Sequence, residues 1–289
     1  MLTTASTSTK KDSSWIVKKG DMFHVHAFNP HPLLRHCVDS YLIVSADQSE
    51  GFIEKIFFPQ ITQSLVFGLD RGSTLYDCNR LEFTSTHFIV GPNDIACRTR
   101  MFPGMHKMIV RFTSGGLYKI FQLPAHTFLN RSQDAIKFLG KQVIEISRHL
   151  NETSVSGKIQ LMDDWLLRQL KRPKKPQRNI DDAIQLIERH RGNISLRELE
   201  ETTFTTKRTL ERHFLEQAGL YPKSFSRLVR FCSMIRYLES NVNVKWQQLA
   251  EIFGYYDHSH LIHEFKILTG VSPHHFFSEK ASFESIMQI

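Results

Sequence analysis

Residues 249–273 read LAEIFGYYDHSHLIHEFKILTGVSP, and this stretch decides the fold of the C-terminal part of the 289-residue chain because an earlier stretch repeats its pattern. The first copy has Leu210, Phe214, Gly219, Pro222 and Phe225, and Leu261, Phe265, Gly270, Pro273 and Phe276 follow in the same order 51 positions later (261 − 210). Apolar residues at i and i+4 predict a helix, so each copy predicts a short helix, a turn and a second helix, which is the helix-turn-helix arrangement. A plain helical bundle would explain the leucines and phenylalanines, but not the glycine and proline that repeat in register.

The repeated region resembles the DNA-binding domain of the AraC/XylS family of transcription regulators across residues 180–278. The resemblance is carried by Ala250, Gly254-Tyr255, Asp257-x-Ser259, Phe265-Lys266, Gly270 and Pro273 in the second copy, and by Gly219, Pro222, Arg227 and Arg230 in the bridge AGLYPKSFSRLVRF, residues 218–231. It implies two helix-turn-helix units that read adjacent major grooves of double-stranded DNA. The first copy departs from the family, with Glu200 in place of a usual alanine and Phe204 in place of a usual turn glycine. Phenylalanine tolerates the backbone angle of such a turn poorly, so we expect a remodelled first turn.

The candidate DNA-contacting residues lie on three predicted helices. Thr206 is the expected N-cap of the first recognition helix, from Lys207 to Gln217, and Asp257 is the expected N-cap of the second recognition helix. A long connecting helix is expected from Pro222 to about Ser240. Arginine can read guanine, glutamate can accept from cytosine, and isoleucine can pack on a thymine methyl group. The connector arginines either clamp phosphate or brace the core. The residues selected are Lys207, Arg208, Glu211 and Arg212, then His258, Ser259, Ile262 and His263, then Arg227 and Arg230.

The N-terminal part has a different pattern of apolar and turn-forming residues. Short apolar and β-branched runs between about Met22 and Phe112, such as SYLIV and KMIVRF, alternate with turn-forming residues, which predicts an antiparallel β-barrel or sandwich. From Ser132 to Leu170 helical spacing predicts two helices that cover the barrel or form a dimer face. The predicted fold class is therefore α+β: a cupin-like β-barrel or sandwich sensor domain with covering helices, followed by an all-α domain with tandem helix-turn-helix units. Family members commonly pair the two, the first binding an effector or mediating dimerisation.

The predicted domain organisation has four parts. A flexible arm takes residues 1–14, and the β-rich effector or dimerisation domain with its C-terminal helices takes residues 15–170. KRPKKPQR, residues 171–178, combines two prolines with five positive charges and predicts an exposed linker. The DNA-binding domain takes residues 179–289 and opens with a capping box at Ser195-x-x-Glu198.

Composition narrows the class of protein. The net charge of +8 favours a polyanionic partner, and no apolar run approaches a spanning helix, so we expect a cytoplasmic protein that associates with the nucleoid through DNA. An enzyme of the cupin type is a rival reading because of His24-Val25-His26, but the glutamate that should follow is absent, so no catalysis, metal or cofactor is expected. A second rival is a degenerate regulator that acts mainly through protein contacts. Beyond DNA, the candidate partners are RNA polymerase, a small-molecule effector and a second copy of the chain.

Overall fold

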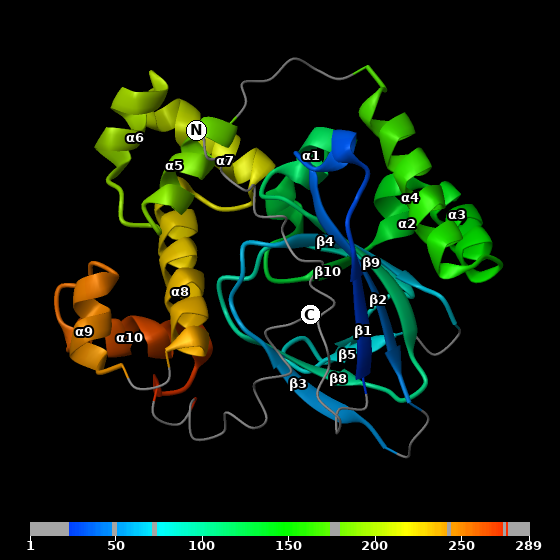
Figure 1. The fold of residues 1–289 in the computed structure, drawn as a ribbon, viewed down its shortest axis with the longest axis horizontal. Helices are drawn as coiled ribbons and strands as arrows, with labels where there is room; N and C mark the ends of the chain where they lie inside the picture. Colours follow the sequence, from blue (N-terminus) through cyan, green and yellow to red (C-terminus); the bar gives the residue numbers. More distant parts are fainter. Residues whose placement is uncertain are drawn as a thin grey trace, which may run out of the picture.

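The computed structural model describes residues 23–47, 51–70, 74–173, 180–241, 244–273 and 276 (Figure 1). The predicted arm, residues 1–14, and residues 174–178 of the predicted linker lie outside the described residues. A β-rich N-terminal domain and an all-helical C-terminal domain lie side by side, which confirms the predicted α+β class.

Two antiparallel sheets face each other in the N-terminal domain and form a sandwich. The six-stranded sheet has the order β1 (Phe23–Phe28), β2 (Val38–Ala46), β9 (His106–Phe112), β4 (Gln63–Gly68), β7 (His87–Val90) and β10 (Ser132–Asp134). The four-stranded sheet has the order β3 (Ile53–Phe57), β8 (Cys97–Met101), β5 (Leu75–Asp77) and β6 (Glu82–Phe83). Two short 3-10 helices, η1 (Pro32–Leu34) and η2 (Ala125–Phe128), lie in the connections.

Helices cover the outer face of the six-stranded sheet (Figure 1). They are α1 (Gly116–Phe121), α2 (Ala135–Leu139), α3 (Gln142–Asn151) and α4 (Val155–Leu170). Trp165 of α4 packs edge-on against Phe67 of β4, and the Tyr41 hydroxyl donates to Asp163 Oδ1 at 2.7 Å. Three helices lie between Ser132 and Leu170, where the sequence predicted two, because Gly140 at φ 76° ends α2 before α3 begins.

The C-terminal domain contains α5 (Asp181–Arg189), α6 (Leu196–Thr203), α7 (Lys207–Gln217), α8 (Pro222–Ser240), α9 (Trp246–Ile252) and α10 (His258–Thr269). The repeated apolar residues form its core, where the rings of Phe214 and Phe225 lie 5.5 Å apart and Leu210 and Leu261 are buried. The capping box at Ser195 is present with both of its hydrogen bonds, as predicted. Within the described part of the chain, no helix is long and apolar enough to cross a membrane.

Apolar contacts and an ion pair join the two domains. Phe58 of the N-terminal domain belongs to the apolar cluster of the helical domain and lies 4.6 Å from the ring of Phe276. At the other end of the interface, Lys119 of α1 forms an ion pair with Asp181 at the first turn of α5. The helical domain is therefore docked on the sandwich at both of its ends.

Candidate nucleic-acid interface and inner cavity

Helix α7 presents the polar face that the sequence predicts. Lys207, Arg208 and Arg212 are exposed and Glu211 is half-buried, whereas Leu210 and Phe214 on the other face are buried in the core. Among the residues that the structure describes, no carboxylate forms an ion pair with Arg208 or Arg212: Arg212 lies 3.4 Å from His213 Nε2, and Glu211 lies 3.9 Å from Lys207 Nζ. Two exposed arginines four residues apart on one helical face can both reach into a groove.

The turn before α7 keeps the helix-turn-helix geometry in spite of its two unusual residues. Phe204 ends α6 in the left-handed conformation, at φ 50°, with its side chain 88% exposed. Glu200 Oε1 accepts a hydrogen bond from the backbone N–H of Lys207, the first residue of α7. Thr206 occupies the predicted N-cap position, but its hydroxyl binds Thr209 instead of capping a backbone N–H. The expected remodelling is therefore wrong: Glu200 caps the recognition helix, and Phe204 takes the conformation that a glycine would take.

Helix α10 is the second recognition helix. Asp257 caps it, accepting from the N–H of His260 at 2.7 Å, as predicted. His258, Ser259 and His263 are exposed and Ile262 is half-buried, whereas Leu261 and Phe265 are buried. All four predicted contact residues thus lie on or beside the outward face of this helix.

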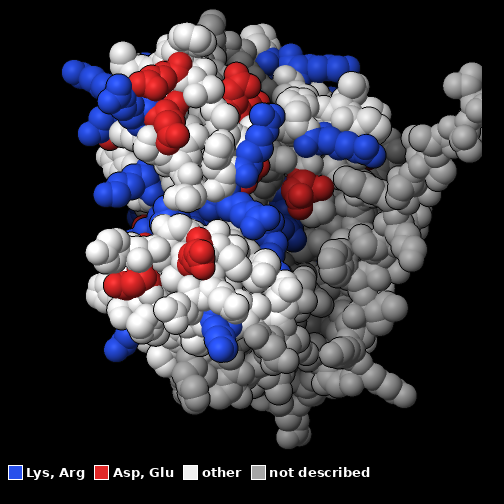
Figure 2. All heavy atoms as spheres, turned by 60° about the vertical axis from the view of Figure 1, so that its left-hand side comes forward, with Lys and Arg blue, Asp and Glu red and all other residues white. Residues whose placement is uncertain are grey.

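The connector arginines lie in a cleft between the two helix-turn-helix units. Arg227 Nε lies 3.3 Å from Glu264 Oε2 of α10, and Arg230 donates to the carbonyl of Gly192 at 3.2 Å and lies over the ring of Tyr255. Both are half-buried. Lys223, Ser195 and His260 also line the cleft, and none of these three was selected from the sequence as a contact residue. Figure 2 shows a band of basic residues between the two lobes of the helical domain. The guanidinium groups brace the units and also make the cleft basic.

The N-terminal domain contacts the C-terminal ends of both recognition helices. Gln63 Nε2 donates to the carbonyl of Gln217 at 3.2 Å, and His126 Nδ1 donates to that of Leu215 at 3.2 Å. The backbone N–H of Ala96 donates to the carbonyl of Leu268 in α10 at 3.1 Å. These contacts join the sandwich to the two helices that are expected to meet DNA.

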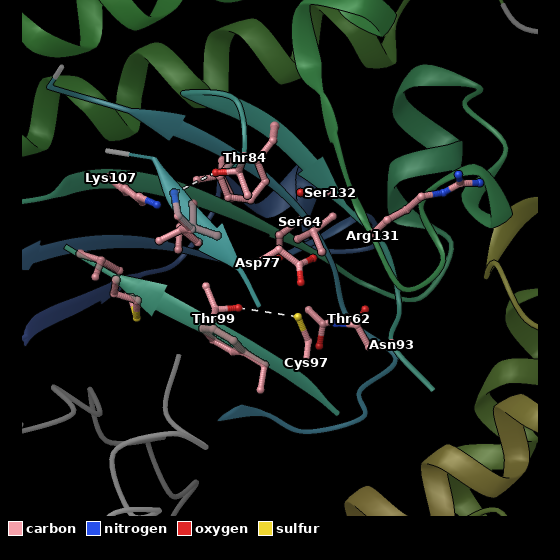
Figure 3. Close-up of a pocket in the computed structure, with 18 of the residues that line it drawn as sticks. Thr62, Ser64, Asp77, Thr84, Asn93, Cys97, Thr99, Lys107, Arg131 and Ser132 are labelled. Atoms are coloured by element: carbon pink, nitrogen blue, oxygen red, sulfur yellow. Dashed lines mark hydrogen bonds between the residues drawn. The ribbon is translucent and has the colours of Figure 1, made fainter. Parts of the chain in front are cut away.

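A cavity of about 140 Å³ lies between the two sheets of the sandwich (Figure 3). Its wall combines apolar side chains with hydroxyl and amide groups, and Lys107 of β9 points into it, whereas the Arg131 side chain points away. Burial lowers the pKa of Lys107 to about 7, and Asp70 opposes this effect. Lys107 is not among the candidate site residues that the sequence predicts.

The paired histidines of β1 do not form the centre of a metal site in this structure. His24 and His26 are both exposed, and His24 Nε2 lies 3.1 Å from Asp47 Oδ1. Among the residues that the structure describes, no group of three histidine, cysteine or carboxylate side chains is placed to hold a metal ion.

Family comparisons divide the chain in the same way as its fold. Residues 199–279 match the family model of a helix-turn-helix domain, a range that begins in α6 and extends beyond α10. Residues 26–134 match the model of a domain of unknown function (DUF6597), which spans the strands of the sandwich. No curated protein matches the chain.

The solved structures that match this chain have low sequence identity to it and low TM-scores. ToxT from Vibrio cholerae O395, bound to (E)-4-(8-methylnaphthalen-1-yl)but-3-enoic acid, is 14% identical with a TM-score of 0.44, over 89% of this chain and 98% of that chain. Wild-type ToxT from Vibrio cholerae strain SCE256, bound to an unsaturated fatty acid, is 12% identical with a TM-score of 0.38, over 80% of this chain and 96% of that chain. The AraC-like transcriptional activator CuxR is 10% identical with a TM-score of 0.23, over 76% and 80%. At these identities and TM-scores the structural similarity supports no conclusion about function.

Proposed function

We propose that this chain is a DNA-binding transcription regulator of the AraC type, because residues 199–279 match the helix-turn-helix domain family. In this proposal α7 and α10 read adjacent major grooves, and the N-terminal domain controls them. The observation that carries the proposal is the pair of capped helices with polar outer faces, joined by α8. The 19 residues of α8 span roughly 28 Å at about 1.5 Å per residue, which approaches the roughly 34 Å between successive major grooves on one face of DNA.

In this proposal the outer residues of the two recognition helices contact bases and the connector contacts the backbone. Arg208 and Arg212 are the candidates for guanine, and His258 and His263 for the second groove, beside Lys207, Glu211, Ser259 and Ile262. Arg227 and Arg230 contact phosphate from the basic cleft while they hold α10 against α8. The N-cap that Glu200 supplies supports a working first unit, which argues against the degenerate regulator.

The N-terminal domain is proposed to bind a small-molecule effector or to join two copies of the chain. The cavity between its sheets supports the first role, because segments of its wall also touch the helical domain. The protein is proposed to act in the cytoplasm on nucleoid DNA, to contact RNA polymerase, and to carry out no catalysis. No metal or cofactor is part of this proposal.

Selection of duplexes from a random pool by the purified full chain tests the proposal. In that experiment the wild type should enrich a site with two contacted segments about one helical turn apart. Arg212→Ala should cost about 1–3 kcal/mol on the best site and relax the preference at one position. If Arg212→Ala weakens all duplexes equally and leaves the preference intact, α7 does not read bases.

Arg227→Ala is the matched control on the connector. It should weaken binding to all duplexes alike and lower the slope of log K against log salt by about one unit, since one phosphate contact is lost. An unchanged salt slope would assign Arg227 to bracing α10 through Glu264 alone. Circular dichroism must first show that both variants are folded.

A further inference from the structure

Lys107 is a buried amine without a hydrogen-bond partner. Lys107 is 2% exposed, and its Nζ has no hydrogen-bond acceptor among the residues that the structure describes. The centre of the Phe88 ring lies 5.4 Å from Nζ. Buried ionisable groups are normally paired, because an unpaired charge in an apolar interior is costly. An amine in this position therefore marks a place where a partner is missing.

The other charged groups of the cavity wall already have partners. Asp77 Oδ1 accepts from the N–H groups of Asn79 and Arg80 at 2.8 and 3.1 Å. Arg111 lies 3.8 Å from Asp39, and Arg131 donates to the carbonyl of Thr127 at 3.1 Å. Lys107 thus differs from the three other charged residues that line the cavity.

The surroundings of Lys107 define the chemistry of the missing partner. Leu42, Val44, Met101 and Met105 are buried at the apolar end of the cavity, and Thr84 and Thr99 add hydroxyl groups beside them. We propose that this cavity binds a compact organic acid, with its carboxylate on the Lys107 ammonium and its apolar body among these side chains. The inference rests on the proposed effector function and gives the effector a chemical class.

The size of the cavity limits the apolar body. A cavity of about 140 Å³ is similar to one of about 150 Å³ that holds a benzene ring in another protein. A ring or a short branched chain matches this volume, so the proposed class of ligand is an aryl or short acyl monocarboxylate.

The wall of the cavity is linked to the helical domain through α8 and the turn that follows α7. Gln60 and Asn93 line the cavity and pair through their backbones at 2.8 and 2.9 Å. The residues next to them face the helical domain: the carbonyl of Pro59 accepts from Cys232 Sγ at 3.6 Å, and Pro92 faces Gly219. Gln60 and Asn93 thus link the cavity wall to the loops that face the helical domain.

Binding of paired probes to the full chain tests the inference without DNA. The probes are benzoate, phenylacetate and cyclohexanecarboxylate, each compared with its primary amide by calorimetry and by thermal shift. In the wild type at least one acid should bind roughly tenfold or more tighter than its amide, because a charge-assisted pair replaces an empty site. In Lys107→Met the acid and the amide should bind within about twofold of each other.

Lys137→Met is the control, because Lys137 is exposed on α2 and does not line the cavity. It should leave the ratio of acid to amide affinity unchanged. The inference is overturned if no acid binds more tightly than its amide to the wild type, or if the preference survives in Lys107→Met. Since DNA selection by the unliganded chain is measured separately, the ligand assignment can fail while the proposed function stands.

Discussion

Replacing Lys107 by methionine should stabilise the unliganded protein, in a way that depends on pH. The folded state lowers the pKa of this amine from 10.5 to about 7, because burial disfavours the ammonium form. At about 1.4 kcal/mol per pKa unit the full shift corresponds to several kcal/mol, and local rearrangement or water entry reduces it. Methionine has a similar length and no charge, so we expect Lys107→Met to raise the free energy of unfolding at pH 7 by about 2–4 kcal/mol.

The sign of the pH dependence follows from proton binding. Between pH 7 and 10.5 the unfolded wild type binds more protons at this lysine than the folded protein does, so the stability of the wild type rises with pH through that window. The advantage of Lys107→Met should therefore be largest at and below pH 7 and shrink towards pH 10. Urea denaturation followed by circular dichroism at pH 6, 7.5 and 9 measures it, with Lys137→Met as the control. An advantage that is absent at pH 6, or equal at all three pH values, would refute the reasoning.

Three further substitutions test the turn before α7 and the domain interface. Glu200→Ala should lower the free energy of unfolding by about 1 kcal/mol in urea denaturation, because the N–H of Lys207 loses its acceptor. Phe204→Gly should raise it by about 1 kcal/mol in the same assay, since glycine adopts the left-handed conformation without the strain of a side chain. Gly219→Ala should destabilise more than Gly270→Ala, although both glycines have positive φ, because only the added methyl at 219 meets the N-terminal domain. Limited proteolysis should then cut Gly219→Ala faster, and equal rates would contradict the interface.

The helical domain could be predicted in detail because its signals are local. Apolar spacing, N-cap residues and the proline at a first turn each indicate a helix or its start within a few residues. Because the pattern is repeated, these signals occur in both copies. The predicted bounds of α7 and α8 agree with the structure for this reason. Asp257 was identified as an N-cap in the same way, because a capping side chain reaches only the next turn.

The features that were missed depend on contacts between distant segments. Glu200 looked like a defect because its partner, the N–H of Lys207, is set by the path of the turn. Arg227 could be assigned to phosphate or to the core, and its ion pair with Glu264 needs the position of α10. In KMIVRF, residues 107–112, the alternation of side chains places Lys107 and Met108 on opposite faces of the six-stranded sheet. Lys107 is buried because the second sheet covers its face, and this packing depends on segments that are distant in the sequence.

The N-terminal domain holds the recognition helices through hydrogen bonds to backbone carbonyl groups near their C-terminal ends. The last carbonyl groups of a helix lack partners inside the helix, and here Gln63 and His126 supply donors near the end of α7, and Ala96 near the end of α10. Because the acceptors are backbone atoms, side-chain changes on the DNA-facing surface leave these contacts in place. Helix α8 fixes the distance between the two units on one side, and the sandwich constrains their orientation on the other. The segments that carry these donors therefore join the position of both reading helices to the conformation of the N-terminal domain.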